Sequence, residues 1–217
     1  MTNDTILYGY WRSSATYRTR IALNLKGVVY KTVGVHLLKN EQSQPAHLAR
    51  HPSGRVPILE IDGHRIGQSM AMVEYLDETR PEPPLLPRDA YLRAHVRDLK
   101  DQIVADIHPI NNTSTLARLR SQFGADDAAI AAWYEHWIVR GFQVLEQMLP
   151  DAGNFCVGNA VTLADIVLVP QVANARRYPQ IDLKPFPNIV RIDAALRQIE
   201  AFAKAAPENQ PEAREAP

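Results

Sequence analysis

The chain has 217 residues, of which 46% are hydrophobic and 22% charged, and this balance is typical of a globular protein with one or two domains. A formal net charge of zero, without a basic run, argues against a nucleic-acid partner. The sequence has no run of 18 apolar residues, no signal-peptide pattern and a single cysteine, Cys156, so we expect a cytoplasmic protein without a membrane span or an intrachain disulfide.

The first eighty residues alternate strand and helix patterns. Apolar and β-branched runs predict strands at residues 6–11, 28–37, 56–61 and 64–66. Apolar residues at helical spacing predict helices at residues 16–25 and 69–79, and the polar stretch 38–52 is expected to be irregular. Asp62-Gly63, between the last two strands, is a strong hairpin signal. The order β-α-β-β-β-α is typical of a thioredoxin-like α/β domain, although other small α/β folds share this spacing.

The remaining residues predict helices almost throughout. Residues 80–89 contain four prolines and no helical period, so we place a linker and a domain boundary there. Helices are expected at residues 91–107, ahead of the helix-breaking Pro109, at 126–149, from 162 onward and at 187–205. The polar, proline-bearing tail 207–217 is expected to be disordered. We therefore predict an α/β domain at residues 1–83 and an all-helical domain at residues 90–206.

Thr162 and Asp165 have the spacing of a capping box, in which a hydroxyl and a carboxylate three residues later satisfy each other's backbone N–H groups. Val161 and Ile166 occupy the positions of the matching hydrophobic staple. The apolar run that follows predicts a buried helix, so we expect Asp165 to stabilise the fold, by roughly 1 kcal/mol or more, rather than to take part in chemistry. Cys156 has apolar neighbours and no basic one, which indicates a small core residue.

Ser13 and Ser14 lie in the turn between the first strand and the first helix. A hydroxyl group at such a turn caps the free N–H groups of the helix, and the helix dipole favours negative charge beside it. Arg12 and Arg18 add positive charge on either side. The serine pair is therefore either an ordinary helix cap or a site for an anion, a carboxylate or a thiolate.

Two further features could bind a peptide-like ligand. Val56-Pro57 opens the third predicted strand, where a cis proline would leave the backbone of Val56 available for hydrogen bonds. Gln68-Ser69 opens the second helix, where Ser69 is a candidate cap and a second site for a carboxylate. Each feature alone is explained by a strand proline or a helix cap.

Three segments carry a resemblance to a known family. The string SSxxxRxRIAL from Ser13, the segment QSMAMVEYLDETRP from Gln68 and the segment LVPQVANARRY from Leu168 resemble the zeta class of glutathione transferases, which includes maleylacetoacetate and maleylpyruvate isomerases. The resemblance runs from about residue 6 to residue 187. It implies a thioredoxin-like domain followed by an all-α domain, a homodimer, and glutathione as the cofactor in the first domain.

The same resemblance implies which residues line or approach glutathione. They are Ser13, Ser14, Ala15, Thr16, Tyr17, Arg18, Gln44, Val56, Gln68, Ser69, His108, Asn112 and Ser114. His108 lies in the string IHPINN, where a helix is broken, and this string resembles the maleylpyruvate branch of the family. That branch tends to be basic just after the string, whereas this chain has Thr113-Ser114, so the resemblance leaves the substrate open between the two maleyl compounds.

Arginine side chains bind carboxylates in a bidentate manner, which makes Arg12, Arg176 and Arg177 candidates for holding the substrate. Arg176 and Arg177 could equally form a solvated helix face. The sequence contains no HExxH, CxxC, P-loop or GxGxxG string, so we expect neither a metal nor a nucleotide cofactor.

The catalytic hypothesis is that glutathione acts as a nucleophile, with Ser13, Ser14 and Arg12 as catalytic residues. The serines would lower the pKa of the thiol, normally about 8.5, and the thiolate would add to a cis double bond while Arg12 stabilises a carboxylate or the enolate. Ala15 stands where zeta enzymes usually have Cys, which tells against a protein-thiol mechanism but not against a glutathione mechanism. The alternatives are a general glutathione transferase or dehalogenase, and a non-catalytic binding module of the same fold.

Overall fold

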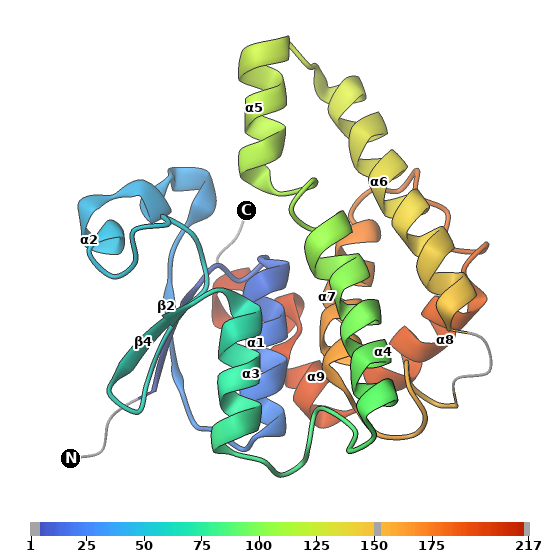
Figure 1. Ribbon diagram of the computed structural model, residues 1–217. Coiled ribbons are helices and arrows are strands. Elements are labelled where there is room, and N and C mark those ends of the chain that lie inside the picture. Colours follow the sequence, from blue (N-terminus) through green and yellow to red (C-terminus); the bar gives the residue numbers. More distant parts are fainter. Residues whose placement is uncertain (1–4, 150–152, 215–217) are drawn as a thin grey trace. The chain divides into compact units, whose positions relative to one another are not determined.

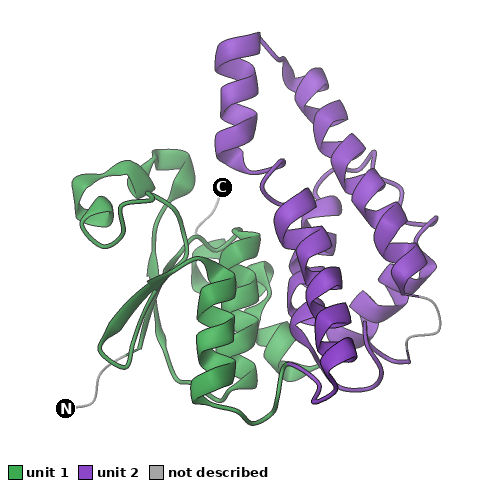
Figure 2. Cartoon of the chain, viewed as in Figure 1, with its two compact units in different colours: residues 1–85, 198–217 green, residues 86–197 purple. Residues whose placement is uncertain are grey.

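The computed structural model describes residues 5–149 and 153–214. The chain divides into two compact units, which are coloured separately in Figure 2. Unit 1 comprises Met1–Leu85 together with Gln198–Pro217, and unit 2 comprises Leu86–Arg197. Residues 198–206, expected in the helical domain, therefore lie in unit 1.

The core of unit 1 is a four-stranded sheet in the order β2-β1-β3-β4 (Figure 1). The strands are β1 (Ile6–Gly9), β2 (Lys31–Gly34), β3 (Ile58–Ile61) and β4 (His64–Gly67). β1 runs parallel to β2 and antiparallel to β3, and the β3–β4 hairpin turns at Asp62-Gly63, as predicted. A right-handed crossover through a helix is the usual way to join two parallel strands, and α1 occupies that connection. The predicted thioredoxin-like order of elements is confirmed.

Two helices of unit 1, α1 (Ser14–Leu25) and α3 (Ser69–Thr79), pack against each other beside the sheet (Figure 1). Ile21 in α1 and Met72 in α3 are fully buried, and Thr19 Oγ1 of α1 lies 3.6 Å from the sulfur of Met72. The stretch expected to be irregular contains short helical turns instead. These are η1 (Leu37–Lys39), η2 (Glu41–Ser43) and α2 (Pro45–Leu48), which begins with a proline at its first position, where a missing N–H group does no harm.

The C-terminal segment belongs to unit 1 because α1 holds it. Helix α9 (Glu200–Ala205) packs on α1, where Arg20 Nε donates to Ala205 O at 2.8 Å and Asn24 Nδ2 donates to Ala201 O at 2.9 Å. The tail was expected to be disordered, but its described part forms two 3₁₀ helices, η4 (Pro207–Asn209) and η5 (Pro211–Arg214). Gln210 anchors the tail by donating to Lys204 O and Ala206 O.

The described part of unit 2 is helical. Its elements are α4 (Ala90–Asp101), the π-helix η3 (Gln102–Ile107), α5 (Thr113–Phe123), α6 (Asp127–Met148), α7 (Leu163–Ala175) and α8 (Pro187–Leu196). α7 is buried along almost its whole length and packs on α4 and α8. None of the helices in the described residues is long and apolar enough to cross a membrane.

The observed helices differ from the expected ones at two places: one helix was not predicted, and one predicted helix is divided. α5 was not predicted, because none of its residues is buried and its apolar pattern is therefore weak, although Asn112 before it and Gly124 after it (φ +66°) are start and stop signals. The helix predicted at residues 187–205 is two helices, α8 in unit 2 and α9 in unit 1.

The capping box at the start of α7 is confirmed. The Asp165 carboxylate is fully buried and accepts hydrogen bonds from the N–H group and the hydroxyl group of Thr162, at 2.7 and 2.8 Å, and from the N–H group of Cys156 at 2.8 Å. Cys156 is 3% exposed, as expected for a core residue. Asp165 therefore satisfies backbone donors that no water could reach.

Candidate functional site

The register of the sheet gathers three sequence-predicted segments at one end. Tyr8 in β1 pairs with Ile58 in β3, and Ile58 pairs with Gly67 in β4. The end of β1, the start of β3 and the end of β4 therefore lie next to one another. The Ser13-Ser14 turn follows the first, Val56-Pro57 precedes the second, and Gln68-Ser69 follows the third.

The serine turn is built as a helix cap. Ser13 is the N-cap residue of α1, and its Oγ accepts a hydrogen bond from Thr16 N at 3.2 Å. Ser14, predicted to precede the helix, is its first residue and is buried. Accepting this bond leaves the Ser13 hydroxyl proton available to donate. Thr16 Oγ1 is buried and has no hydrogen-bond partner.

Two arginine residues, Arg12 and Arg18, lie on either side of this turn in the sequence. Arg12 is exposed, with the centre of its guanidinium group 5.5 Å from the Trp11 ring centroid. Arg18 is 1% exposed, and its Nε and Nη2 have no hydrogen-bond partner. Burial lowers the pKa of Arg18 to about 10, so its guanidinium group is still charged at neutral pH.

The other two segments have unusual backbone geometry. The Val56–Pro57 peptide bond is cis, as predicted, and the described ladder begins at Ile58, so Val56 lies outside the strand pairing. Gln68 has φ +63° and ψ 113°, a strained conformation for a residue other than glycine. Such strain is characteristic of binding sites, and no sequence pattern signals it here. Ser69 is not the cap that was expected: Gln68 precedes α3, and the buried Ser69 is the first residue of the helix.

The remaining predicted residues of unit 1 are distributed along the same elements. Ala15, Thr16 and Tyr17 follow Ser14 in the first turns of α1. Gln44 is exposed and is the residue immediately before α2.

In unit 2, the predicted residues follow the π-helix. His108 is partly buried. Its backbone N–H group donates to Ile103 O, five residues earlier, at 2.8 Å, so the π-helix ends at this histidine. Asn112 is the N-cap residue of α5, and Ser114 lies exposed in the first turn of that helix. Asn111 was not a predicted site residue. It is 8% exposed, and its side-chain Nδ2 and Oδ1 have no hydrogen-bond partner.

The structure separates the two adjacent arginines after α7. Arg176 Nη1 lies 2.6 Å from Oδ2 of the fully buried Asp193 on α8, so its guanidinium group is already paired. Beside Arg177, the ring of Tyr178 stacks on the ring of Tyr134 in α6, with 3.9 Å between centroids. Among the residues that the structure describes, no three His, Cys, Asp or Glu side chains are placed to hold a metal ion.

The chain matches two protein-family descriptions. The N-terminal domain of glutathione S-transferase matches residues 3–78, and the C-terminal domain of the same family matches residues 127–207. A probable maleylacetoacetate isomerase of Vibrio cholerae serotype O1 is 50% identical over 212 residues, which cover 96% of this chain and 98% of the relative.

Two solved structures are similar over nearly the whole chain. The holo structure of a maleylpyruvate isomerase, a bacterial zeta-class glutathione S-transferase, has 48% identity and a TM-score of 0.93 and covers 95% of this chain and 99% of its own. A maleylacetoacetate isomerase from Anaeromyxobacter dehalogenans, with dicarboxyethyl glutathione and citrate bound in its active site, has 43% identity and a TM-score of 0.86 and covers 97% of both chains. The chain belongs to the zeta class of glutathione S-transferases, the family of maleylacetoacetate and maleylpyruvate isomerases. The predicted fold class and family are confirmed.

Proposed function

We propose that this protein is a glutathione-dependent cis–trans isomerase of a maleyl compound, maleylacetoacetate or maleylpyruvate. The observation that carries the proposal is the convergence of the Ser13-Ser14 turn, Val56 and Gln68-Ser69 at one end of the sheet. These three segments supply a helix N-terminus with a hydroxyl donor, a residue that lies outside the strand pairing just before β3, and a second helix N-terminus. Full-length similarity to maleylacetoacetate and maleylpyruvate isomerases supports the same function.

The three segments suit different parts of glutathione. The first turn of α3, at Ser69, offers N–H donors to the γ-glutamyl carboxylate, and the backbone of Val56 can pair with the cysteinyl residue. The thiol then lies at the start of α1, where the helix dipole and the Ser13 hydroxyl stabilise a thiolate. This matters because a free thiol, with a pKa of about 8.5, is mostly protonated at neutral pH.

The reaction conserves glutathione. The thiolate forms a C–S bond to one carbon of the cis double bond, and the electron pair of that bond moves to the conjugated carbonyl oxygen as an enolate. The former double bond is now single and rotates. The electron pair then returns, the C–S bond breaks, and the trans isomer leaves with the thiolate restored. The dicarboxyethyl glutathione in the Anaeromyxobacter relative is a thioether of the kind that such an addition produces.

Arginine side chains hold the substrate carboxylates in this proposal. Arg12 is exposed beside the serine turn and binds a carboxylate or stabilises the enolate. Arg176 and Arg177 after α7 stay candidates from the sequence for the same role, and the structure pairs Arg176 with the buried Asp193. Ala15 supplies no thiol and Cys156 is buried, which is why glutathione must supply the sulfur.

The first test is the loss of absorbance of maleylacetoacetate and of maleylpyruvate, each with and without glutathione. Rapid turnover of one compound that requires glutathione supports the proposal and identifies the substrate. No turnover of either, alongside normal glutathione binding, would exclude the isomerase and leave a general transferase or dehalogenase. Failure to bind glutathione would favour a non-catalytic module. The predicted homodimer and cytosolic location stay predictions.

The role of Ser13 gives a sharper test. Ser13→Ala removes both the helix cap and the thiol donor, so we expect the free energy of unfolding to fall by about 1 kcal/mol and turnover to fall by about a hundredfold. Ser13→Thr keeps a capping hydroxyl and should restore most of the stability. Urea denaturation and turnover at saturating glutathione measure the two effects separately. A larger loss of turnover in Ser14→Ala than in Ser13→Ala would transfer the donor role to Ser14.

A further inference from the structure

Tyr8, Arg50, Glu60 and Arg65 of unit 1 form a closed ring of contacts, in which three strands and one loop take part. Glu60 in β3 and Arg65 in β4 face each other in the ladder, and Glu60 Oε1 lies 2.8 Å from Arg65 Nε and 2.6 Å from Nη2. Tyr8 in β1 donates its hydroxyl hydrogen to Glu60 Oε2 at 3.1 Å. The guanidinium group of Arg50 lies 4.5 Å from the Tyr8 ring centroid, within the range of a cation–π interaction.

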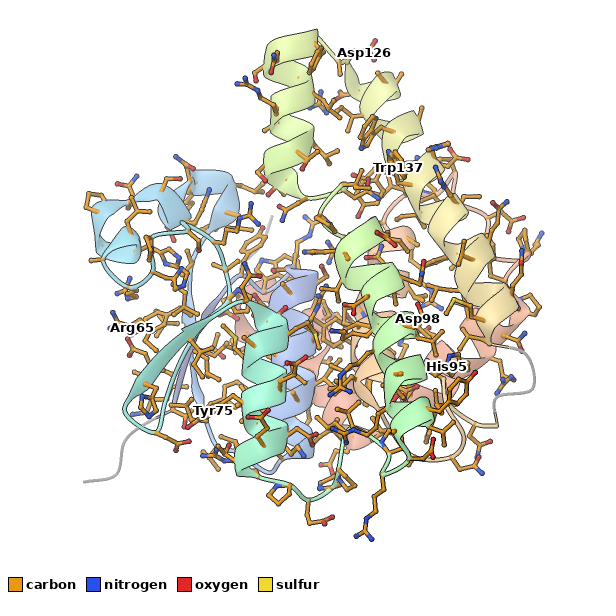
Figure 3. All side chains as sticks on the ribbon, in the orientation of Figure 1. Arg65, Tyr75, His95, Asp98, Asp126 and Trp137 are labelled. Carbon is orange, nitrogen blue, oxygen red and sulfur yellow. The ribbon has the colours of Figure 1, made fainter. Side chains whose placement is uncertain are left out.

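Arg65 closes the ring on the backbone after α2. Its Nη1 donates to Arg50 O at 3.3 Å and to Ala49 O at 3.4 Å. Carbonyl groups at the end of a helix have no partner within it, and a cation is favoured there. Figure 3 labels Arg65 beside the sheet, on the side that carries α2. The Glu60 carboxylate fixes the guanidinium group, and the guanidinium group fixes the loop.

A second contact holds the same loop against the end of β4. A Cβ atom added at Gly67 would overlap the His51 ring, with His51 Cδ2 and Cε1 only 2.8 Å away. The ring is held in turn by Ser53, whose Oγ lies 2.8 Å from His51 Nδ1. The glycine therefore allows the loop to approach the strand immediately before the strained Gln68.

We propose that Arg65, Glu60 and Gly67 are positioning residues that set the affinity for glutathione by fixing the segment 44–56 against the sheet. The inference rests on the proposed function, in which the backbone of Val56, at one end of this segment, pairs with glutathione. None of the three positioning residues has to touch the ligand. The Arg65 and Glu60 side chains are 43% and 25% exposed, and pairs with such exposure contribute little to global stability. The expected effect is therefore local.

The test compares Arg65→Met with a matched control, Arg80→Met. Arg80 also pairs with a carboxylate on the β3–β4 hairpin, with Nη2 at 2.9 and 3.0 Å from the Asp62 oxygens, but its hydrogen bonds go to Asp62 and Thr79. Calorimetry gives the dissociation constant for glutathione, and hydrogen exchange by mass spectrometry follows peptides that span residues 44–56. Gly67→Ala, which displaces His51, serves as a second variant.

We expect Arg65→Met to weaken glutathione binding by about three- to tenfold, the effect of one or two lost hydrogen bonds, and to speed exchange in 44–56. Turnover at saturating glutathione should stay within about twofold of wild type, because the reacting groups are unchanged. Arg80→Met should change neither quantity. Gly67→Ala should resemble Arg65→Met.

Each other outcome contradicts the inference. Faster exchange with unchanged affinity would show that the ring holds the loop without affecting the ligand, and weaker binding with unchanged exchange would show another cause. Equal effects in Arg65→Met and Arg80→Met would mark general destabilisation. A wild-type protein that binds no glutathione would overturn the proposed function itself, while the exchange data would still decide whether Arg65 fixes the loop.

Discussion

The thiol of Cys156 shows how burial of one side chain affects stability. Burial raises the pKa of this thiol well above its ordinary value, and the negative charge of Asp165 acts in the same direction. The unfolded thiol ionises near pH 8.5, whereas the folded thiol stays protonated. The unfolded state therefore binds fewer protons above this pH, and the free energy of unfolding should fall as the pH rises, by up to about 1.4 kcal/mol per unit.

Urea denaturation of wild type and Cys156→Ala at pH 7.5, 8.5 and 9.5 measures this effect. The alanine variant should be less stable at pH 7.5, but it lacks the titrating thiol, so its stability should decline less steeply above about pH 8.5. Parallel pH profiles would contradict the prediction. In the folded wild type, a disulfide reagent should leave Cys156 unmodified at pH 8, and modification should follow unfolding, because the thiolate is the reacting species.

Residues with local partners could be predicted from the sequence, and residues with distant partners could not. Thr162 and Asp165 are three positions apart, so their capping box is visible in the sequence and present in the structure. Arg176 and Arg177 look equivalent in the sequence. Only the fold brings Asp193 on α8 to Arg176 and so distinguishes the pair.

At the scale of elements, the change from α4 to the π-helix is the clearest departure from expectation. Pro109 was expected to break the helix, but the i→i+5 pattern begins at Gln102, several residues earlier. The apolar spacing of a sequence does not distinguish an α-helical turn from a π-helical one. Packing fixes the wider turn: Ile107, at its end, is buried, and α6 packs against the π-helix.

Gly141 in α6 makes this packing possible. A Cβ atom at position 141 would overlap Cγ1 and Cδ1 of Ile107. In the wild-type background, Gly141→Ala should therefore destabilise the protein by about 1–2 kcal/mol, because overpacking outweighs the gain in helix propensity. In an Ile107→Ala background the same substitution enters an emptied space and should stabilise the protein by up to about 1 kcal/mol.

Urea denaturation of the four proteins in this cycle gives the coupling energy directly. The reversal of sign is the test, since it requires the two side chains to compete for one volume. A Gly141→Ala effect of the same sign in both backgrounds would show that the glycine is needed for another reason. Turnover of the two single variants would then show whether displacing Ile107 also affects its neighbour His108.

At the scale of the whole molecule, the order of strands and helices along the first unit and the helical second unit followed from pattern and resemblance, but the path of the C-terminal segment did not. Proline and polar residues after position 206 suggested disorder, and the helical period before it suggested a continuation of the helical domain. The deciding contacts join Arg20 and Asn24 to carbonyl groups about 180 positions later. No local pattern reports such a pairing. The same holds for the candidate site, where the motifs indicated the segments but not the strained Gln68 or the ring around Arg65.

Membership of α9 in unit 1 predicts which parts of the protein loosen together. Phe202 in α9 is fully buried, and Phe202→Ala should remove about 3–5 kcal/mol of stabilisation from the packing of α9 on α1. Phe186, 2% exposed, packs edge-to-face on Phe142 of α6 in unit 2, with 5.6 Å between ring centroids, and provides a matched control. Hydrogen exchange of peptides from α1 and from α6 then reports the two units separately.

We expect Phe202→Ala to speed exchange in α1 by at least about tenfold with a smaller effect in α6, and Phe186→Ala to do the reverse. The reason is that a cavity weakens first the contacts that line it, and each phenylalanine belongs to a different unit. If residues 198–206 belonged to the helical domain, as the sequence pattern suggested, Phe202→Ala would affect α6 more than α1. If both variants speed hydrogen exchange equally in α1 and α6, the two units unfold only together. The packing of α9 would then not define a separately unfolding part of the protein.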